Sequence, residues 1–569
     1  MKRFLILTAA LGAAVAVFVG LTIQPRRKLL GAAADGTIAG VMHVHTNRSD
    51  GSSTPDEVAA AAARAGLQFI VLTDHGDGTR TPDAPAYRSG VLCLDAVEIS
   101  TRGGHYIALD MPPAPYPLGG EARDVVDDVR RMGGFGIVAH PDSPKPELQW
   151  RDWDAPFDAI EMVNPDTGWR LQAAQPGWRP RLRLFAALVD YPFRPVETIA
   201  GLLASDPALP ARWAALAARR RVVTTAGADA HARLALRSAD PGDSALALPL
   251  PGYEPAFHAL SVRVHAERPL SGDAARDAQT IVQAIRGGHL HTVIDGIATP
   301  GLLDLTATHP GGVGREGDEL EPRGPVTLHV RTNAPPSFTT AVWNGAGLVS
   351  GGHHEPEFAV AVPPEPAVFW VDVRPSSAAA GLPWMRSNAI YLRRPGAPAA
   401  VAAAAPPPAV TRSIFDGTTA GWTLEHDPGS VAALDLTSGV NGNELQLRFG
   451  LSNQATPPPF VALSHAIPGG AASFNRLAVT VRAARPMRVS VQLRAAGNGA
   501  ALVRWQRSMF VDVSAQERVL QFDDFRPVDA SQPPAAPGDA LGSVMFVVDP
   551  VNTKRGASGR LWIARAALQ

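Results

Sequence analysis

Histidine and carboxylate side chains recur at the ends of apolar runs in the first half of the chain. The first such run, "GVMHVHTNRSDG", begins as a strand and contains His43 and His45, with Asp50 five residues after the second histidine. Side chains at positions i and i+2 of a strand lie on the same face, so the two imidazoles are expected to point the same way. Imidazole and carboxylate together are a ligand set that suits Zn, Mn or Fe. The run therefore predicts a metal site at the end of a strand.

Later apolar runs end in the same way, in "VLTDH", "DAVEIS", "GGHY", "IVAHP" and "GADAH". The chain has 16 histidines, and six of them fall at these ends. A single histidine is more often structural than a ligand, but six at successive strand ends cannot each be explained in that way. Because a carboxylate can bridge two ions, the set predicts two or three divalent ions. The candidate ligands are His43, His45, Asp50, His75, Glu98, His105, His140, Asp229 and His231.

The elements that must position these residues alternate between strand and helix over residues 37–304. The clearest helix is "TPDEVAAAAARAG", where Thr54 is suited to cap, Pro55 to begin the helix, Glu57 to complete a capping box and Gly66 to end it. Such alternation predicts an α/β barrel or a doubly wound sheet. In an α/β barrel the active site lies at the carboxyl ends of the strands, which is where the candidate ligands fall.

The pattern changes after this region. Strands separated by turns predict a small β-sandwich at residues 320–395, and the Pro/Ala-rich residues 396–410 predict an extended linker. Strand patterns resume over residues 411–569 and predict a second β-sandwich of the jelly-roll kind. The expected fold is therefore an α/β domain followed by two all-β sandwich domains.

Composition narrows the classes of partner. The 569 residues include 46% hydrophobic and 18% charged residues, and the net charge is −1. With no long basic run, this balance argues against a nucleic acid as the main partner. The single cysteine, Cys93, excludes an intrachain disulfide. It lies in an apolar run and is interpreted as a buried small hydrophobe rather than a nucleophile.

Residues 1–30 have two basic residues before an uncharged run, followed by Arg26, Arg27 and Lys28. The run is long enough to span a bilayer and also fits a secretory signal peptide. We therefore expect an exported protein, periplasmic or at the cell surface. The N-terminal segment is expected to be either cleaved or retained in the membrane as an anchor.

The strand-end motifs resemble the polymerase and histidinol phosphatase (PHP) family of metal-dependent phosphoesterases. The matching stretches, in order, are "HVHTNRSDG", "LTDH", "EISTRGGHYIAL", "VAHP" and "GADAH". The resemblance covers residues 37–304 and implies a distorted (β/α)7 barrel with two or three ions, Zn, Mn or Fe, at the strand ends.

The resemblance also implies a role for each ligand. His43 and His45, with Glu98 and Asp229, would bind one ion. Glu98 would bridge to a second ion held by His105 and His140. Asp50, His75 and His231 would form the third site.

The implied chemistry is phosphate ester hydrolysis by a water activated between metal ions. Asp229 or His231 is the expected catalytic group for proton transfer. Arg102 is the candidate phosphate contact, and a solvated loop charge is its alternative. Asp74 is expected either to orient a ligand or to cap a turn. The arginines of the insertion after "AIEMVN" are expected to form a surface stem or to line the mouth of the site. They are Arg179, Arg181, Arg183 and Arg194.

Other residues suggest weaker sites. The "HLH" at His289 and His291 mimics the opening motif, but it resembles the family's late helix and strand rather than a ligand pair. The C-terminal segment resembles galactose-binding-like domains of carbohydrate-binding modules. Trp422, Trp505 and Trp562 are therefore candidates for stacking on sugar rings, with core packing as the alternative for Trp562.

The preferred function is an exported metallohydrolase that cleaves phosphate esters. Its expected substrate is a phosphorylated small molecule or a phosphorylated glycan or lipid, with carbohydrate as a possible partner of the last domain. One alternative is an amide or acetyl hydrolase that uses the same metal cluster. Another is a glycan-binding protein at the cell surface, in which the barrel is only a scaffold.

Overall fold

The computed structural model describes residues 2–569 except 32–35, 236–246, 322, 346, 377–380, 395–409, 497–501, 530–532, 534 and 537. The chain divides into two compact units, each described here by itself. The first comprises Met1–Gly76, Thr81–Pro112 and Val129–Val401, and the second Asp77–Arg80, Pro113–Asp128 and Ala402–Gln569. Apart from residue 410, the expected Pro/Ala-rich linker lies outside the described residues.

Strands and helices alternate in the first unit, as its patterns predicted. The helices of the chain are α1 Lys2–Thr22, α2 Pro55–Arg64, α3 Ala122–Arg131, α4 Pro165–Ala174, α5 Trp178–Asp190, α6 Pro195–Leu202, α7 Leu209–Arg219, α8 Tyr253–Ala259 and α9 Ala274–Gly287. The strands that precede the small β-domain are β1 Lys28–Leu29, β2 Ile38–Val44, β3 Phe69–Leu72, β4 Ala86–Arg88, β5 Val91–Asp95, β6 Val97–Thr101, β7 Gly104–Leu109, β8 Phe135–Val138, β9 Ala159–Val163, β10 Val223–Ala230, β11 Leu234–Ala235, β12 Ala247–Leu248, β13 Ser261–Val264, β14 Leu290–Val293 and β15 Ala298–Thr299. The expected α/β class is confirmed.

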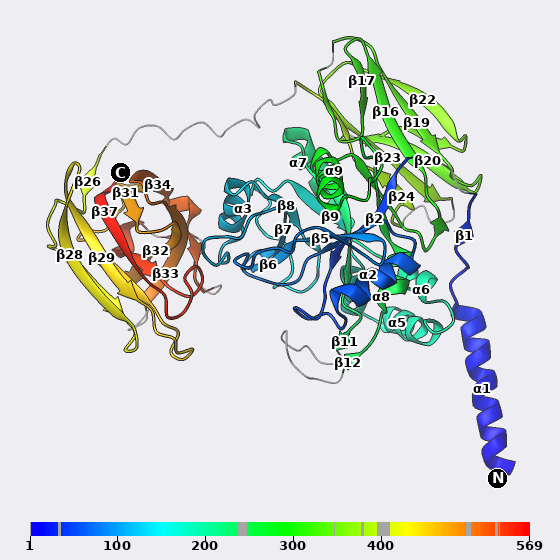
Figure 1. The fold of residues 1–569 in the computed structure, drawn as a ribbon, viewed down its shortest axis with the longest axis horizontal. Coiled ribbons are helices and arrows are strands. Elements are labelled where there is room, and N and C mark those ends of the chain that lie inside the picture. The colour runs from blue at the N-terminus through cyan, green and yellow to red at the C-terminus, as the bar shows by residue number, and fades with distance from the viewer. Residues whose placement is uncertain are drawn as a thin grey trace. The chain divides into compact units, whose positions relative to one another are not determined.

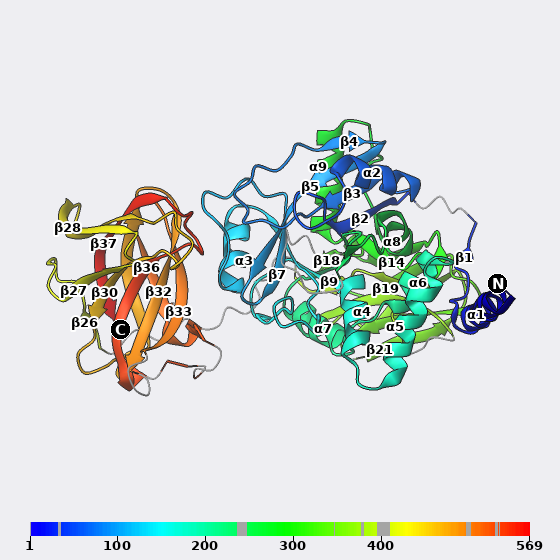
Figure 2. The ribbon, with the colours of Figure 1, turned by 90° about the horizontal axis from the view of Figure 1, so that it is seen from below.

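The main sheet brings the strand ends together. Strands β5, β3, β2, β10, β9 and β8 pair in parallel in that order, and β7 and β6 follow in antiparallel pairing. Only Ala96 separates β5 from β6, and an isolated bridge joins His75, just beyond β3, to Glu98 on β6. The pairings therefore form a closed circuit. Most of its strands are labelled in the first unit in Figures 1 and 2. The carboxyl ends of its parallel strands face a common centre.

Helix α2 shows how local sequence places the first loop. Thr54 accepts a hydrogen bond from the backbone N–H of Glu57, and the Glu57 carboxylate accepts one from the backbone N–H of Thr54. Pro55 begins the helix, and Gly66 has a φ of 75°, in the left-handed region that glycine tolerates. The predicted capping box is confirmed. It anchors the chain directly after the loop that contains Asp50.

A small β-domain completes the first unit. Its strands are β16 Leu303–His309, β17 Gly312–Arg315, β18 Glu319–Leu320, β19 Val326–Thr332, β20 Phe338–Asn344, β21 Gly347–His353, β22 Glu357–Val362, β23 Ala367–Pro375, β24 Met385–Ser387 and β25 Ile390–Leu392. Its apolar core includes Leu328, Phe369 and Trp384, and this core also takes in Val293 from β14 of the main sheet. Strand β24 pairs with β14, so the small domain continues the sheet of the α/β domain.

The second unit contains two six-stranded antiparallel sheets. Its strands are β26 Arg412–Ser413, β27 Trp422–His426, β28 Val431–Gly439, β29 Gly442–Gly450, β30 Val461–Ala466, β31 Arg476–Ala483, β32 Met487–Ala496, β33 Leu502–Val511, β34 Gln516–Gln521, β35 Arg526–Pro527, β36 Leu541–Val548 and β37 Ser558–Leu568, with short 3-10 helices at Phe522–Asp524 and Gly538–Ala540. Trp422 and Trp505 are buried in the core between the sheets. Their faces are therefore closed to sugar, contrary to the expectation. Trp562 is only partly buried, and the Arg482 guanidinium lies 4.0 Å from its ring centroid.

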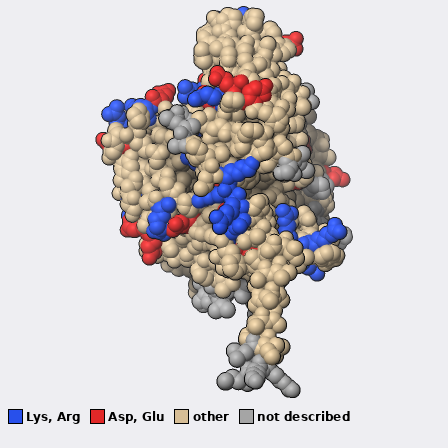
Figure 3. All heavy atoms as spheres, turned by 90° about the vertical axis from the view of Figure 1, so that its right-hand side faces the viewer, with Lys and Arg blue, Asp and Glu red and all other residues tan. Residues whose placement is uncertain are grey.

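Helix α1 is attached to the first unit at its carboxyl end, where the Thr22 hydroxyl donates to Asp190 and the rings of Phe18 and Phe185 meet edge to face. Figure 3 shows Lys and Arg side chains on the face from which this largely apolar helix projects. Within the part of the chain that the structure describes, none of the helices combines the length and apolar character needed to cross a bilayer.

Candidate metal centre

The nine candidate ligands meet at one end of the closed sheet. His43 lies on β2 and His45 directly after it, whereas Asp229 and His231 lie at the end of β10. The pairing of β2 with both of its neighbours shifts register beyond Val41, and His43 has a φ of 62°. A β-bulge, rather than the simple alternation of a strand, therefore aims both imidazoles at the same point.

Glu98 is the centre of the cluster. Its Oε1 lies 2.9 Å from His105 Nδ1 and 3.0 Å from His140 Nε2. Its Oε2 lies 3.3 Å from His43 Nε2, 3.2 Å from His45 Nε2 and 3.3 Å from His75 Nδ1. Because the two oxygens face different sets of histidines, this carboxylate has the geometry of a bridge between two ions.

The first group of ligands has the spacing of a tetrahedral site. Asp229 Oδ1 lies 3.3 Å from His43 Nε2 and 3.5 Å from His45 Nε2, and both nitrogens lie equally near Glu98. Ligands about 2.0–2.1 Å from a tetrahedral ion are separated from one another by about 3.3–3.5 Å. His43, His45, Asp229 and Glu98 are thus spaced as four ligands of one ion.

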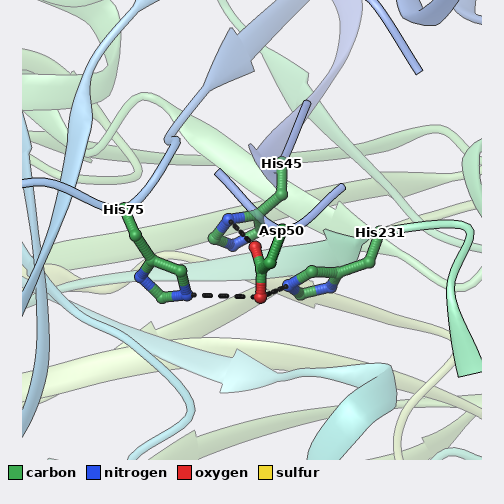
Figure 4. Close-up of side chains that lie close together, drawn as sticks. All are labelled: His45, Asp50, His75 and His231. Atoms are coloured by element: carbon green, nitrogen blue, oxygen red, sulfur yellow. Dashed lines mark ion pairs between the residues drawn. The ribbon is translucent and has the colours of Figure 1, made fainter. Parts of the chain in front are cut away.

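A second group lies at the accessible rim (Figure 4). Asp50 Oδ2 lies 3.3 Å from His231 Nε2 and 3.7 Å from His75 Nε2, and Asp50 Oδ1 lies 3.4 Å from His45 Nδ1. The Asp50, His75 and His231 side chains are 21–23% exposed, whereas those of His43, His45 and Glu98 are at most 1% exposed. The cluster therefore opens to solvent on the side of Asp50.

Buried nitrogens without hydrogen bonds support metal binding. Both ring nitrogens of His45 and Nδ1 of His75 are buried and make no hydrogen bond among the described residues. Buried polar atoms in folded proteins are nearly always satisfied, so an orphaned nitrogen points to a missing partner. A cation between the imidazoles and the carboxylates satisfies these nitrogens, and the donor set fits a divalent metal.

The charges of the cluster act on one another strongly. Burial alone would raise the pKa of Glu98, but the imidazoles of His43, His75 and His105 outweigh it and hold that pKa well below its usual 4.5. Burial opposes protonation of His140, yet its hydrogen bond to Glu98 and the charge of that carboxylate raise its pKa to about 9. Because a metal-binding imidazole must be deprotonated, an ion at this position must displace the proton that the raised pKa of His140 favours.

Three of these residues have strained backbones. His43, His140 and Asp229 have φ values of 62°, 29° and 46°, in a region that non-glycine residues rarely adopt. Each such conformation costs on the order of 1–3 kcal/mol and persists only where the surrounding structure imposes it. Their coincidence at one cluster indicates that the fold holds these side chains in place for function.

Sequence reasoning missed Glu161. Its Oε1 lies 2.7 Å from His43 Nδ1, and its Oε2 accepts hydrogen bonds from the His140 backbone N–H and the Asn164 amide. A Cβ on Gly227 would lie only 1.9 Å from Glu161 Oε1, so glycine is required beside this carboxylate. Glu161 orients His43 from behind, as carboxylates behind metal-binding histidines do. The available signal was a carboxylate in the middle of the apolar strand "AIEMVN".

Replacing Glu161 with glutamine is expected to weaken metal binding by about 10–100-fold, because the carboxylate that orients His43 is lost. The metal concentration that gives half-maximal activity measures this effect, and saturating metal should restore most of the rate. An unchanged metal requirement would contradict the positioning role.

Asp74 positions a loop and is not among the groups that could hold an ion. Its Oδ1 accepts from the Thr46 backbone N–H and the Ser49 hydroxyl, and its Oδ2 accepts from the Thr46 hydroxyl. These bonds fix the turn that leads into Asp50. Of the two expected roles, Asp74 thus orients a ligand through the loop.

The candidate substrate contacts lie at the surface. Arg102 is exposed in the turn between β6 and β7. In the insertion, Arg183 donates to the Gly201 carbonyl oxygen, and Arg194 donates to that of Gln24. The insertion folds as α4, α5 and α6, which pack against one another, and the contacts of Arg183 and Arg194 are those of a surface stem.

Cys93 is buried, which raises the pKa of its thiol to about 11 and agrees with its interpretation as a core residue.

Known proteins resemble parts of this chain. No family model matches the chain. A 3',5'-nucleoside bisphosphate phosphatase of Chromobacterium violaceum is 32% identical over 102 residues, which are 16% of this chain and 36% of that protein. The similarity to PHP phosphoesterases is confirmed. The chain thus spans about a third of the length of that phosphatase. An uncharacterised protein of Methanocaldococcus jannaschii is 26% identical over 138 residues, which are 22% of this chain and 80% of that protein.

Solved structures match parts of the chain at low sequence identity. A two-domain protein of Bacteroides vulgatus that contains a predicted PHP-like metal-dependent phosphoesterase covers 65% of this chain and 99% of its own, with 15% identity and a TM-score of 0.28. A family 11 carbohydrate-binding module of Clostridium thermocellum covers 28% of this chain and 94% of its own, with 17% identity and a TM-score of 0.24.

Proposed function

We propose that this protein is an exported metallohydrolase that cleaves phosphate esters with two or three divalent ions. The observation that carries the proposal is the convergence of nine imidazole and carboxylate ligands, with Glu98 at their centre and with separations suited to metal coordination. We assign the closed sheet to the distorted (β/α)7 barrel of the PHP family. The proposed substrate is a phosphorylated small molecule, or a phosphorylated glycan or lipid.

The ligands divide into three proposed positions. The first is the set of His43, His45, Asp229 and Glu98 Oε2. The second is formed by Glu98 Oε1 with His105 and His140, and the third by Asp50, His75 and His231. The ligand types suit Zn, Mn or Fe in each position.

The residues around the proposed ions suggest how a phosphate ester would approach and how protons would be transferred. When bound, divalent ions supply the charge that activates a water and neutralises phosphoryl oxygens. Substrate would approach from the side of Asp50, because the Asp50 and His75 side chains are 21–22% exposed, whereas those of His43 and Glu98 are at most 1% exposed. His231 is the better placed proton carrier, since its side chain is 23% exposed whereas that of Asp229 is 5% exposed. Arg102 remains the proposed phosphate contact, because it directly follows β6, the strand that contains Glu98.

A substrate panel separates this proposal from its alternatives. The metal content of the full chain is measured first, and the chain loaded with Zn, Mn or Fe is then offered phosphomonoesters, phosphodiesters, amides and acetyl esters. The expected result is release of inorganic phosphate from the phosphomonoesters, or of a phosphomonoester from the phosphodiesters. Turnover confined to amides or acetyl groups would favour the alternative hydrolase. A metal content under one ion per chain, with tight glycan binding, would favour the scaffold interpretation.

We also propose that any carbohydrate partner binds the second unit at a surface pocket and not on its buried tryptophans. The pocket has Phe460 and Met545 as apolar lining and Gln492, Arg494 and Arg504 as polar lining. An aromatic ring beside hydrogen-bonding groups is a combination that suits a sugar.

Export, proposed from the pattern of residues 1–30, would be checked by cell fractionation.

A further inference from the structure

A second group of metal-ligand types lies far from the cluster around Glu98. It consists of His265, directly after β13, His291 on β14, and Glu316, directly after β17. Strand β13 pairs with β2 so that Val264 lies opposite Ile38, at the end of β2 remote from His43. About 16 Å of strand separates Ile38 from His43, at about 3.3 Å per residue. The trio is therefore distinct from the proposed catalytic centre.

The atoms of the trio approach one another without hydrogen-bonding. Glu316 Oε1 lies 3.2 Å from His265 Nε2 and 3.4 Å from His291 Nδ1. These three atoms and His291 Nε2 are buried and make no hydrogen bond among the described residues. The two distances match the separation of about 3.3–3.5 Å expected between ligands of one tetrahedral ion.

Burial makes these unsatisfied atoms costly. The His291 side chain is 0% exposed and that of Glu316 is 1% exposed. A buried polar group without a partner costs about 1–3 kcal/mol, and more when it is charged. A cation between the three side chains satisfies Glu316 Oε1 and one nitrogen of each histidine at once.

The surroundings hold the trio rigidly. Glu316 Oε2 accepts a hydrogen bond of 3.0 Å from the Asn388 backbone N–H. The Asn388 amide donates to the carbonyl oxygens of Thr224 and Leu290, on β10 and β14. Supporting bonds of this kind fix metal ligands in orientation. The nearby cation Arg263 donates to Asp295 at 2.8 Å, so its charge is already paired.

We propose that His265 Nε2, His291 Nδ1 and Glu316 Oε1 bind one further divalent transition-metal ion, with Zn²⁺ as the best match to the donor set. Three protein ligands leave a fourth position for water, and the His265 side chain, 12% exposed, marks the way in from solvent. The ion joins the α/β domain, which supplies both histidines, to the small β-domain, which supplies Glu316. Its role is structural, and the proposal does not depend on the phosphoesterase function.

This assignment divides the "HLH" motif. His289 Nε2 lies 3.0 Å from Asp318 Oδ1, whereas His291 points to Glu316. Sequence reasoning set the motif aside because it resembles the late helix and strand of the PHP family rather than a ligand pair. In the structure, only His291 is a ligand, and its partners come from other strands.

The metal content of three single variants tests the site. His265→Gln and Glu316→Gln are each expected to lower the Zn content of the full chain by one equivalent relative to wild type. Added Zn²⁺ should also raise the melting temperature of the metal-stripped wild type more than that of either variant. His289→Gln is the matched control, because it changes the neighbouring histidine and should leave both measurements at the wild-type value.

Circular dichroism of each variant shows whether it folds, and His265→Gln is the safer variant because its side chain is partly exposed. Equal metal content and equal melting response in wild type, folded His265→Gln and His289→Gln would overturn the proposal. In that case the trio is a buried cluster of titratable side chains. The cluster around Glu98 is unchanged in all three variants, so phosphate release can succeed or fail independently.

Discussion

Replacing Glu98 with glutamine is expected to lower phosphate release by about 10³-fold, equivalent to about 4 kcal/mol of transition-state stabilisation. Both oxygens of Glu98 face imidazoles, two at Oε1 and three at Oε2. An amide has only one oxygen and no negative charge, so it cannot bridge two ions. Initial rates with saturating metal, together with metal content by elemental analysis, measure the effect.

Asp110→Asn is the matched control for this carboxylate-to-amide change. Asp110 follows β7, its side chain is 56% exposed, and it pairs with Arg286 away from the cluster. Its φ of 55° is one that asparagine tolerates, so the backbone should not change. The control should keep the wild-type rate. A Glu98→Gln protein that folds and retains both its metal and its rate would eliminate the bridging role and, with it, the proposed centre.

The double substitution His43→Ala with His45→Ala is expected to abolish phosphate release and to remove at least one equivalent of metal. Both Nε2 atoms belong to the tetrahedral group with Asp229 and Glu98, so their loss leaves only carboxylates there. The measurement is phosphate release against a no-enzyme blank, alongside metal analysis. An unchanged rate would refute the hydrolase proposal in every form that uses this cluster.

Because His43 and His45 are fully buried, the alanine protein has cavities and is at risk of unfolding. His43→Gln with His45→Gln keeps more of the side-chain volume and serves as the second variant. The matched control is His353→Ala with His354→Ala, which removes two neighbouring histidines from the small β-domain. Activity in this control and none in the folded glutamine variant would assign the loss to the ligands themselves.

Local sequence determined much of the first unit. Thr54, Pro55 and Glu57 predicted the start of α2 because capping involves bonds within one helical turn. The ligands of the cluster were recognisable because each follows or lies within its own apolar strand. Parallel strands end at a common edge, so a chemical pattern repeated at strand ends predicts a site even before the pairing of the strands is known.

Contacts between distant segments were decided only by the tertiary structure. The bulge at His43 depends on pairing with both neighbouring strands, and the role of Glu161 depends on its distance of 2.7 Å from a histidine 118 residues away. From the sequence, Trp422 and Trp505 were candidates for stacking on sugar rings, and only the packing of the two sheets buries them in the core.

The sequence by itself determined the chemical class of the main site, because nine histidine and carboxylate residues at the ends of buried strands would be costly to bury for packing alone. Which atoms face one another was decided by folding, since a ligand cage joins side chains from five or more strands. The trio of His265, His291 and Glu316 illustrates the same limit. No two of its members stand at metal-ligand spacing in the sequence. Antiparallel pairing of β13 with β14 brings the two histidines near each other. The turn after β17 contains Glu316, whose Oε1 lies within 3.4 Å of a nitrogen of each histidine.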